Sequence, residues 1–486
     1  MLSNGSVRQV HRVSRKAALA VFLFAWTLIT HGKYSASGDE PHYLMVTHSI
    51  VVDHDMDVAN NYADNDGRFF GHDRLEMGLH AVPARNGHVR PIHDVGLAVA
   101  LVPAYFIAQH LAQLPSNAVL SRFRMDRGLF AYSIVSVFLI AVTAIGLMLL
   151  ADGLCCLTSP IAAALLVVAA GVSPPIVSHS FLVFPEALAL FVTCLVVWLS
   201  LRPADKNDHA LLMAILFALG VLPWAHHKYL LYVPGVLFAI AWKRWDIIRA
   251  LSNRERLVAI GLFGLPQLAL LVWSWNEWGT LGGALTTARL PFSANMLKAG
   301  ILGLWFDRQS GLLAYAPLYW IVPACWYLAR KTTWPFLVPI VLLYVPAASF
   351  TIGWWAGFSP AARYLVPLIP FFVVAIAGAL RYRAIRVAAL VLLVPQVFID
   401  AVVWQHPRTL WPSADGNGAL RTLGAVGRAY EATLPAVQAG GSLAVAVDVA
   451  VVALAASAAL RDTLARERSA ATRASFKKRR NALLKI

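Results

Sequence analysis

An acidic pair follows the first apolar stretch of the chain directly, in the sequence GDEPHY, residues 38–43. Asp39 and Glu40 are followed by His42, and charged groups beside a membrane are costly unless they have a function. A carboxylate in this place can take up the proton of a substrate hydroxyl or hold a cation. Asp39 could also simply cap the helix that begins at Pro41. The additional Glu40 and His42 favour chemistry over a cap alone.

Cations also occur within apolar surroundings further along the chain. Lys228 lies in WAHHKYLLYVP, beside His226, and Arg363 lies in SPAARYLVP. A charge embedded in this way is a candidate functional group, and the planar guanidinium fork of Arg suits two phosphate oxygens. Arg363 could instead be an anchor whose head reaches water. Arg308, in FDRQSGLL, is a third candidate, for which pairing with Asp307 is the alternative.

One further carboxylate and several aromatic residues share these surroundings. Glu186, in FPEALAL, would be neutral or paired if it is buried. It could bind a substrate hydroxyl or a histidine such as His179, or have a purely structural partner. The aromatic residues near these motifs could stack on a substrate, line a lipid groove or belong only to interfacial belts: Trp305, Trp354, Trp355 and Tyr364.

The first long polar segment contains one pattern with metal-like spacing. Asp53, Asp55 and Asp57 have the spacing of the first ligands of a calcium loop, but Val58 stands where the sharp turn needs Gly. The sequence therefore predicts no metal site and leaves a bound divalent cation as an alternative. The mixed apolar and polar residues at 43–51 predict a helix lying along the membrane interface.

Composition identifies the class of protein that positions these residues. Hydrophobic residues make up 59% of the 486-residue chain and charged residues only 14%, far from a soluble average. The sequence predicts an all-α, polytopic transmembrane bundle of about 12–13 helices with a long first outer loop carrying interfacial helices. Thirteen apolar runs support it: 17–30, 94–114, 129–151, 160–178, 181–200, 210–225, 229–242, 257–275, 311–328, 334–352, 363–380, 386–404 and 441–460.

Basic residues in the short loops predict the orientation. The N-terminus, the loops 243–256, 329–333 and 381–386, and the basic tail are expected to be cytoplasmic. The net charge of +16 is then explained by anionic lipid, without nucleic acid. The loops 31–93, 276–310, 351–362 and 405–440 are expected outside. Both termini inside require an even number of crossings, so one broken segment should re-enter, either at 171–179 or at 222–229.

Taken in order, several motifs resemble the GT-C superfamily of glycosyltransferases, which includes protein O-mannosyltransferases and the lipid A aminoarabinose transferase. The first is GDEPHY, and four others are similar to the bacterial branch of the superfamily: HSFLVFPEALAL, LPWAHHKYLL, WFDRQSGLLAYAPLYW and WWAGFSPAARYLVPLIPF. The resemblance covers about 31–375. It implies a catalytic module over 1–380, including the outer loop 31–93. Residues 381–486 would add C-terminal helices, the loop 405–440 and the tail.

The resemblance implies transfer of a sugar from a polyprenyl-phosphate donor to a lipid, glycan or protein acceptor on the outer face of a bacterial inner membrane. The acidic residue of the first outer loop is the catalytic base in that superfamily and matches Asp39, with Glu40 beside it to orient the acceptor or hold a cation. No nucleotide or obligatory metal is expected. The expected donor-phosphate ligands are Lys228, Arg363, His226 and Arg308, and the expected substrate contacts are His42, Tyr43, Glu186, Trp355 and Tyr364.

Two other functions are compatible with the same residues. A transporter or a flippase for lipid-linked glycans would use the intramembrane charges to bind and move its substrate, at a midplane site reached from both sides. A non-catalytic scaffold would not need the acidic pair. A transferase instead requires its carboxylate and its cations on one cavity that opens to the outer face.

Overall fold

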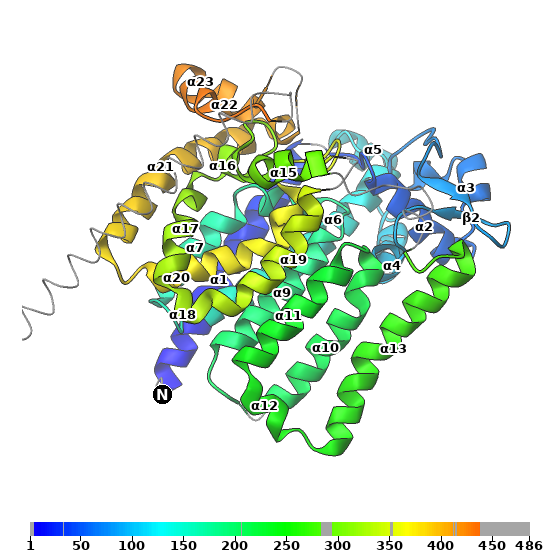
Figure 1. Cartoon of the computed structure of the whole chain (residues 1–486). Helices are drawn as coiled ribbons and strands as arrows, with labels where there is room; N and C mark the ends of the chain where they lie inside the picture. The colour runs from blue at the N-terminus through cyan, green and yellow to red at the C-terminus, as the bar shows by residue number, and fades with distance from the viewer. Residues whose placement is uncertain are drawn as a thin grey trace, which may run out of the picture.

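The computed structural model describes residues 4–32, 34–205, 207–282, 294–349, 353–411, 413 and 416–437. The apolar run 441–460 and the basic tail lie outside these residues. Long helices form most of the molecule (Figure 1), which confirms the predicted polytopic helical class. Six helical segments in the described part are long and apolar enough to cross a membrane: Val7–His31, Arg127–Leu154, Asp208–Ala225, Asn253–Trp278, Arg330–Ala348 and Arg383–Gln405.

The first half of the chain contains the elements of the polar segment 31–93 and a closely packed group of helices. Its elements are α1 (Asn4–Gly32), α2 (Glu40–Val52), α3 (Ala59–Ala63), the 3-10 helix η1 (Asp66–Phe70), β1 (Ala81–Pro83), β2 (Val89–Pro91), α4 (Gly96–Leu111), α5 (Asn117–Arg122), α6 (Arg127–Leu154), α7 (Pro160–Gly171), α8 (Ile176–Phe181), α9 (Glu186–Leu201), α10 (Asp208–Ala225) and α11 (Tyr229–Lys243).

The second half continues the bundle and covers one end of it. Its elements are α12 (Trp245–Ala250), α13 (Asn253–Trp278), α15 (Ala294–Phe306), α16 (Leu312–Tyr315), η2 (Pro317–Ile321), α17 (Val322–Leu328), α18 (Arg330–Thr333), η3 (Trp334–Phe336), α19 (Leu337–Ala348), η4 (Arg363–Leu368), α20 (Ile369–Ala379), α21 (Arg383–Gln405), η5 (Pro407–Leu410), α22 (Gly418–Thr422) and α23 (Gly424–Ala432).

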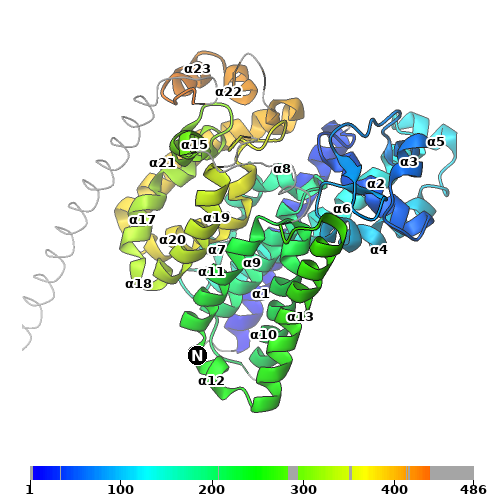
Figure 2. The same ribbon diagram turned by 45° about the vertical axis from the view of Figure 1, so that its right-hand side comes forward.

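The centre of the bundle is built where α6 packs against α9 and α1. Small residues allow the close approach: a Cβ added at Gly146 or Gly153 of α6 would lie 3.2 Å from the Cα atom of a residue on α9. Without a hydrophobic driving force in lipid, such close packing is a main source of helix association. On the other side of the bundle α10 and α13 run side by side (Figure 2), with α13 largely exposed.

The predicted outer loops lie together at one end of the molecule. The N-terminus, α12 and α18 are at the opposite end (Figure 1), so the basic segments are grouped as expected. Contacts support the grouping: Glu277, after the 257–275 run, binds Arg90 of the first loop, and the Arg308 carbonyl accepts from Asn417. The described parts of these loops therefore lie close to one another, whereas the side of the membrane that each end faces stays a prediction.

Two local expectations about the helices have different outcomes. The breaks are confirmed, since α7 ends before α8 within 171–179 and α10 ends before α11 within 222–229; re-entry of either segment stays a prediction. The helix predicted at 43–51 is present as α2, and its position along the membrane interface stays a prediction. Every residue from Glu40 to Ser49 is buried, because α4 and η1 pack on it.

The polar segment 31–93 also contains a hairpin, which the helical patterns of the sequence do not predict. Strands β1 and β2 pair antiparallel, with Val82 opposite Arg90. The turn contains Asn86 and Gly87, and Gly87 has a φ of +87°, a conformation that suits glycine. The sequence RNG between two short extended runs is a known signal for such a hairpin.

Candidate active site

Asp39 stands at the turn into α2. It occupies the N-cap position, but its side chain makes no capping hydrogen bond, so the helix-cap alternative is wrong. Instead its Oδ2 accepts a hydrogen bond from Nη1 of Arg363 at 3.2 Å, and its Oδ1 lies 3.9 Å from Nε2 of His93. The side chain is 31% exposed and therefore remains accessible to a ligand.

Four charged side chains of alternating sign form a continuous chain that starts at Asp39. Arg363, the first residue of η4, donates from Nε to Oε1 of Glu186 at 2.9 Å. Lys228, immediately before α11, donates from Nζ to the same oxygen at 2.5 Å. The Arg363 side chain is only 6% exposed, so its interpretation as an anchor reaching water is wrong. The chain order is Asp39, Arg363, Glu186 and Lys228.

Aromatic rings shield the two cations of this chain from water. The guanidinium carbon of Arg363 lies 3.9 Å from the ring centre of Phe184, and Nζ of Lys228 lies 5.1 Å from those of Tyr229 and Tyr364. A cation over an aromatic face is stabilised more strongly when it is desolvated. Tyr364, predicted as a substrate contact, therefore lies directly beside the chain of charges.

Three buried polar atoms near these charges have no hydrogen-bond partner among the described residues: Oε2 of Glu186, Nε2 of His179 and the Tyr229 hydroxyl. His179 uses its other ring nitrogen on the Pro175 carbonyl, 2.9 Å away. Buried polar atoms are nearly always paired, so unpaired ones need an explanation. A bound polar ligand with hydroxyl groups would supply the missing partners.

Glu40 points into a different environment from Asp39. Its Oε2 accepts hydrogen bonds from the Val183 N–H at 2.7 Å and the Tyr132 hydroxyl at 2.9 Å, and its Oε1 accepts one from the Ser37 N–H at 3.2 Å. Burial raises the pKa of Glu40 to about 7, although these hydrogen bonds oppose the shift. The contacts indicate that Glu40 ties α2 to the bundle, and its predicted role on the acceptor is not favoured by them.

Three histidines surround the exposed side of Asp39. His42 stacks on His80 with ring centroids 3.6 Å apart, and Nδ1 of His80 lies 3.0 Å from Nε2 of His93. Burial lowers the pKa of His42 to about 3 and that of His93 to about 4. Burial alone would raise the pKa of Asp39, but its neighbours His93 and Arg363 lower it below the usual value. The carboxyl is thus ionised beside neutral imidazoles near neutral pH.

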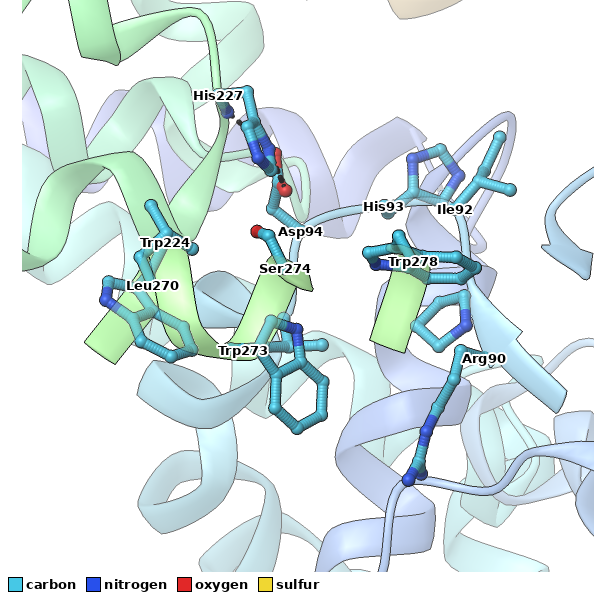
Figure 3. A pocket seen from close by; sticks show the side chains of 12 residues that line it. Arg90, Ile92, His93, Asp94, Trp224, His227, Leu270, Trp273, Ser274 and Trp278 are labelled. Atoms are coloured by element: carbon cyan, nitrogen blue, oxygen red, sulfur yellow. Dashed lines mark hydrogen bonds and ion pairs between the residues drawn. The ribbon is translucent and has the colours of Figure 1, made fainter. Parts of the chain in front are cut away.

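A small pocket adjoins His93 and is also lined by His227, the residue before Lys228. Its empty volume is about 370 Å³. Figure 3 shows Asp94 and His227 facing each other across one side of it, with Arg90 and Trp278 on the other. The His227 N–H donates to Oδ2 of Asp94 at 2.7 Å, which positions the residue before Lys228.

An apolar groove with about 1330 Å³ of empty space continues from this pocket between α4, α9, α10 and α13. The pocket and the groove share Val95, Trp224 and Trp273. Val99, Phe217 and Val221 line the groove and are between 37% and 49% exposed, so it opens onto the side of the bundle. A lipid chain could enter it from there.

A structural comparison aligns one solved structure, that of ArnT, with most of this chain. The crystal structure of ArnT from Cupriavidus metallidurans bound to undecaprenyl phosphate aligns with 92% of this chain and 72% of that chain. The TM-score is 0.44 and the sequence identity is 14%. No family model matches the chain, and no curated protein matches it. The roles proposed for the residues of this protein therefore rest on the contacts and chemistry of those residues.

Three other predicted site residues differ in how they contact the residues around Asp39. Tyr43 is buried with its ring 4.9 Å from that of His93. His226 accepts from the Lys228 N–H at 3.2 Å. Trp355 packs edge-on against Trp354, and no contact joins it to the chain of charges in the described residues.

Arg308 lies in a neighbouring loop at the same end of the molecule. Its backbone binds the Pro435 carbonyl and Asn417, and its side-chain Nε is buried without a partner among the described residues. The loop is joined to the start of η4 by a hydrogen bond from the Ala362 N–H to the Ser310 carbonyl, 2.9 Å long. A place for Arg308 in the donor site stays a prediction.

The residues of the calcium-like pattern have separate partners. Asp53 accepts from Asn60 and Asn61, Asp55 accepts from Ser49, and Asp57 lies 2.7 Å from Nδ1 of His88. These hydrogen bonds organise the polar segment 31–93. The group of potential metal ligands in the described residues is a different one, formed by Asp39, His80 and His93.

Proposed function

We propose that this protein transfers a sugar from a polyprenyl-phosphate donor to an acceptor hydroxyl, with Asp39 as the general base. One observation carries the proposal. The accessible, ionised carboxylate of Asp39 is held by the buried cation Arg363, which is linked through Glu186 to a second buried cation, Lys228. The resemblance of GDEPHY and the later motifs to GT-C enzymes supports the same function. The reaction would take place at the end of the molecule that carries the outer loop.

The geometry suggests how the reaction would proceed. Arg363 orients the Asp39 carboxylate and keeps it ionised, which a general base requires. As the acceptor oxygen attacks the anomeric carbon of the sugar, its proton passes to Asp39 and the bond from that carbon to the phosphate oxygen breaks. The phosphate leaves as an anion, so it needs cations and no strong acid.

Lys228 and Arg363 are the proposed cations for the donor phosphate. Lys228 can donate three hydrogen bonds and uses one on Glu186, so it retains donors for a phosphate. Arg308 and His226 would complete the site. The arrangement requires the phosphate to approach Glu186 closely, and the two cations offset that repulsion.

Replacing Lys228 by Met should weaken donor binding. The Met side chain retains most of the apolar stem but removes the charge, and a charge-assisted hydrogen bond contributes roughly 1.5–3 kcal/mol. We expect the dissociation constant for polyprenyl phosphate to rise roughly tenfold to a hundredfold. Lys243→Met, at the other end of α11, is the matched control and should bind as wild type. If Lys228→Met and the wild type bind polyprenyl phosphate with equal affinity, Lys228 does not contact the donor phosphate.

The apolar groove is the proposed place for the donor's lipid tail, since it leads from the side of the bundle to the pocket beside His93. Val221→Trp should fill part of it. Displacing about two methylene groups, each contributing ~0.8 kcal/mol, would weaken binding of a long-chain donor roughly tenfold. A donor with a short lipid should be affected little. Val391→Trp, on the exposed face of α21, is the control; a similar loss there would show a general effect on the protein.

Turnover of a panel of polyprenyl-phosphate sugars tests the proposed function. Purified full-length protein would be incubated with each donor and candidate acceptors, and products followed by mass spectrometry. Release of free polyprenyl phosphate together with a glycosylated acceptor is expected for at least one donor. Movement of an unchanged lipid-linked sugar across a vesicle membrane, without transfer, would overturn the proposal in favour of a flippase.

A further inference from the structure

Two histidines at the open end of the β1–β2 hairpin lie beside Asp39. His80 immediately precedes β1 and His93 follows β2 by two residues, and the Ile92 N–H donates to the His80 carbonyl at 2.9 Å. The hairpin therefore brings the two rings together, although the two strands and the turn separate His80 from His93 in the sequence. One potential ligand atom from each of Asp39, His80 and His93 lies within 4.8 Å of the other two.

The separations between these atoms suit a metal ion. Nδ1 of His80 is 3.0 Å from Nε2 of His93, which is 3.9 Å from Oδ1 of Asp39. Neighbouring ligand atoms around tetrahedral zinc are about 3.3–3.5 Å apart, given bonds of about 2.0–2.2 Å. The two observed distances bracket this value. Two imidazoles and one carboxylate, with a fourth position open, form a ligand set found in catalytic zinc sites.

Surrounding side chains hold the three residues in place. His42 stacks on the His80 ring, and the Tyr62 hydroxyl lies 2.6 Å from Nδ1 of His42. Arg363 holds the other oxygen of Asp39 at 3.2 Å. A hydrogen bond to a ligating carboxylate, such as that from Arg363, orients a metal ligand and contributes strongly to metal affinity. A hydrogen bond between two histidines alone would not require a carboxylate on the same side.

We propose that Asp39, His80 and His93 bind a divalent first-row transition-metal ion such as Zn²⁺, whose open position takes the acceptor hydroxyl oxygen. The second half of this proposal rests on the proposed function. The hydroxyl proton passes to the Asp39 oxygen that is not bound to the ion. The electron pair of the acceptor oxygen forms the bond to the anomeric carbon, and the bond to the lipid phosphate breaks with its electrons leaving on the phosphate oxygen.

Metal binding is measured first without any turnover. Full-length protein in lipid nanodiscs would be stripped with a chelator and titrated with Co²⁺, whose visible absorption reports tetrahedral coordination, and Zn²⁺ content would be measured by mass spectrometry. We expect one tightly bound ion per chain in the wild type and loss of that ion in His80→Ala and His93→Ala. His88→Ala, at the turn of the same hairpin, should bind as wild type because His88 pairs with Asp57.

The outcomes separate this inference from the proposed function. Wild-type protein without a stoichiometric ion, or a His93→Ala variant that keeps it, would overturn the metal site even if sugar transfer is observed. Stoichiometric zinc in a protein that transfers no sugar would support the site and count against the proposed function. Transfer that is no faster with zinc than after chelation would overturn the role of the ion in acceptor binding.

Discussion

Asp39→Asn should lower turnover roughly 10²- to 10⁴-fold, the usual cost of losing a general base. Asn keeps the shape of the side chain, and its amide oxygen can still accept the hydrogen bond from Arg363. Because Asp39 makes no capping hydrogen bond and is 31% exposed, the change should cost no more than about 1 kcal/mol of stability. Turnover under conditions in which chemistry limits the rate, thermal unfolding and donor affinity are the measurements.

Glu40→Gln is the control next in sequence and should behave in the opposite way. Its amide group would face the Val183 N–H or the Tyr132 hydroxyl, or the Ser37 N–H on the other side, and leave a buried donor unpaired. We expect a loss of roughly 1–3 kcal/mol in stability with near-normal turnover per folded molecule. Full turnover by Asp39→Asn would show that Asp39 is not the base and would favour the transporter interpretation.

Part of this site could be predicted because unusual residues stand out in an apolar sequence. Lys228, Arg363 and Glu186 are charges among apolar neighbours in motifs that resemble GT-C enzymes, and the structure joins all three through one carboxylate oxygen. Charges that must avoid lipid gather in the protein interior, which is the physical basis of the prediction. Their pairing could not be predicted, since Asp39 and Arg363 are separated by 324 residues and periodicity reports only local structure.

The residues that were missed depend on a turn rather than on a helix. His80 and His93 carry no local signal of their own, but they flank a hairpin whose Asn86–Gly87 turn could have been recognised. Once the hairpin is placed, antiparallel pairing brings its two ends together. The burial of residues 40–49 of α2 has a different cause: their polar side chains find partners inside the protein, as His48 does with Tyr105.

The second large effect concerns the carboxylate shared by the two cations. Glu186 is fully buried, with Lys228 at 2.5 Å and Arg363 at 2.9 Å from the same oxygen. Glu186→Gln preserves its shape but leaves two neighbouring buried cations with only Asp39 to balance them. Removing one member of a buried ion pair typically costs about 3–5 kcal/mol, because the remaining charge is desolvated without compensation. The unfolding temperature in lipid nanodiscs should therefore fall strongly in Glu186→Gln. Glu76→Gln, at an exposed position of the segment 31–93, should leave the unfolding temperature unchanged.

A double variant distinguishes charge balance from mere packing. Glu186→Gln combined with Lys228→Met leaves Arg363 and Asp39, a pair of opposite sign, so the double variant should be more stable than Glu186→Gln alone. Such a gain from a second substitution is a coupling between neighbours, of the size that double-mutant cycles resolve. If the cost arose from packing, the second substitution would add to the loss. A double variant less stable than Glu186→Gln would mean that Lys228 and Glu186 are not held as a charge pair in the folded protein.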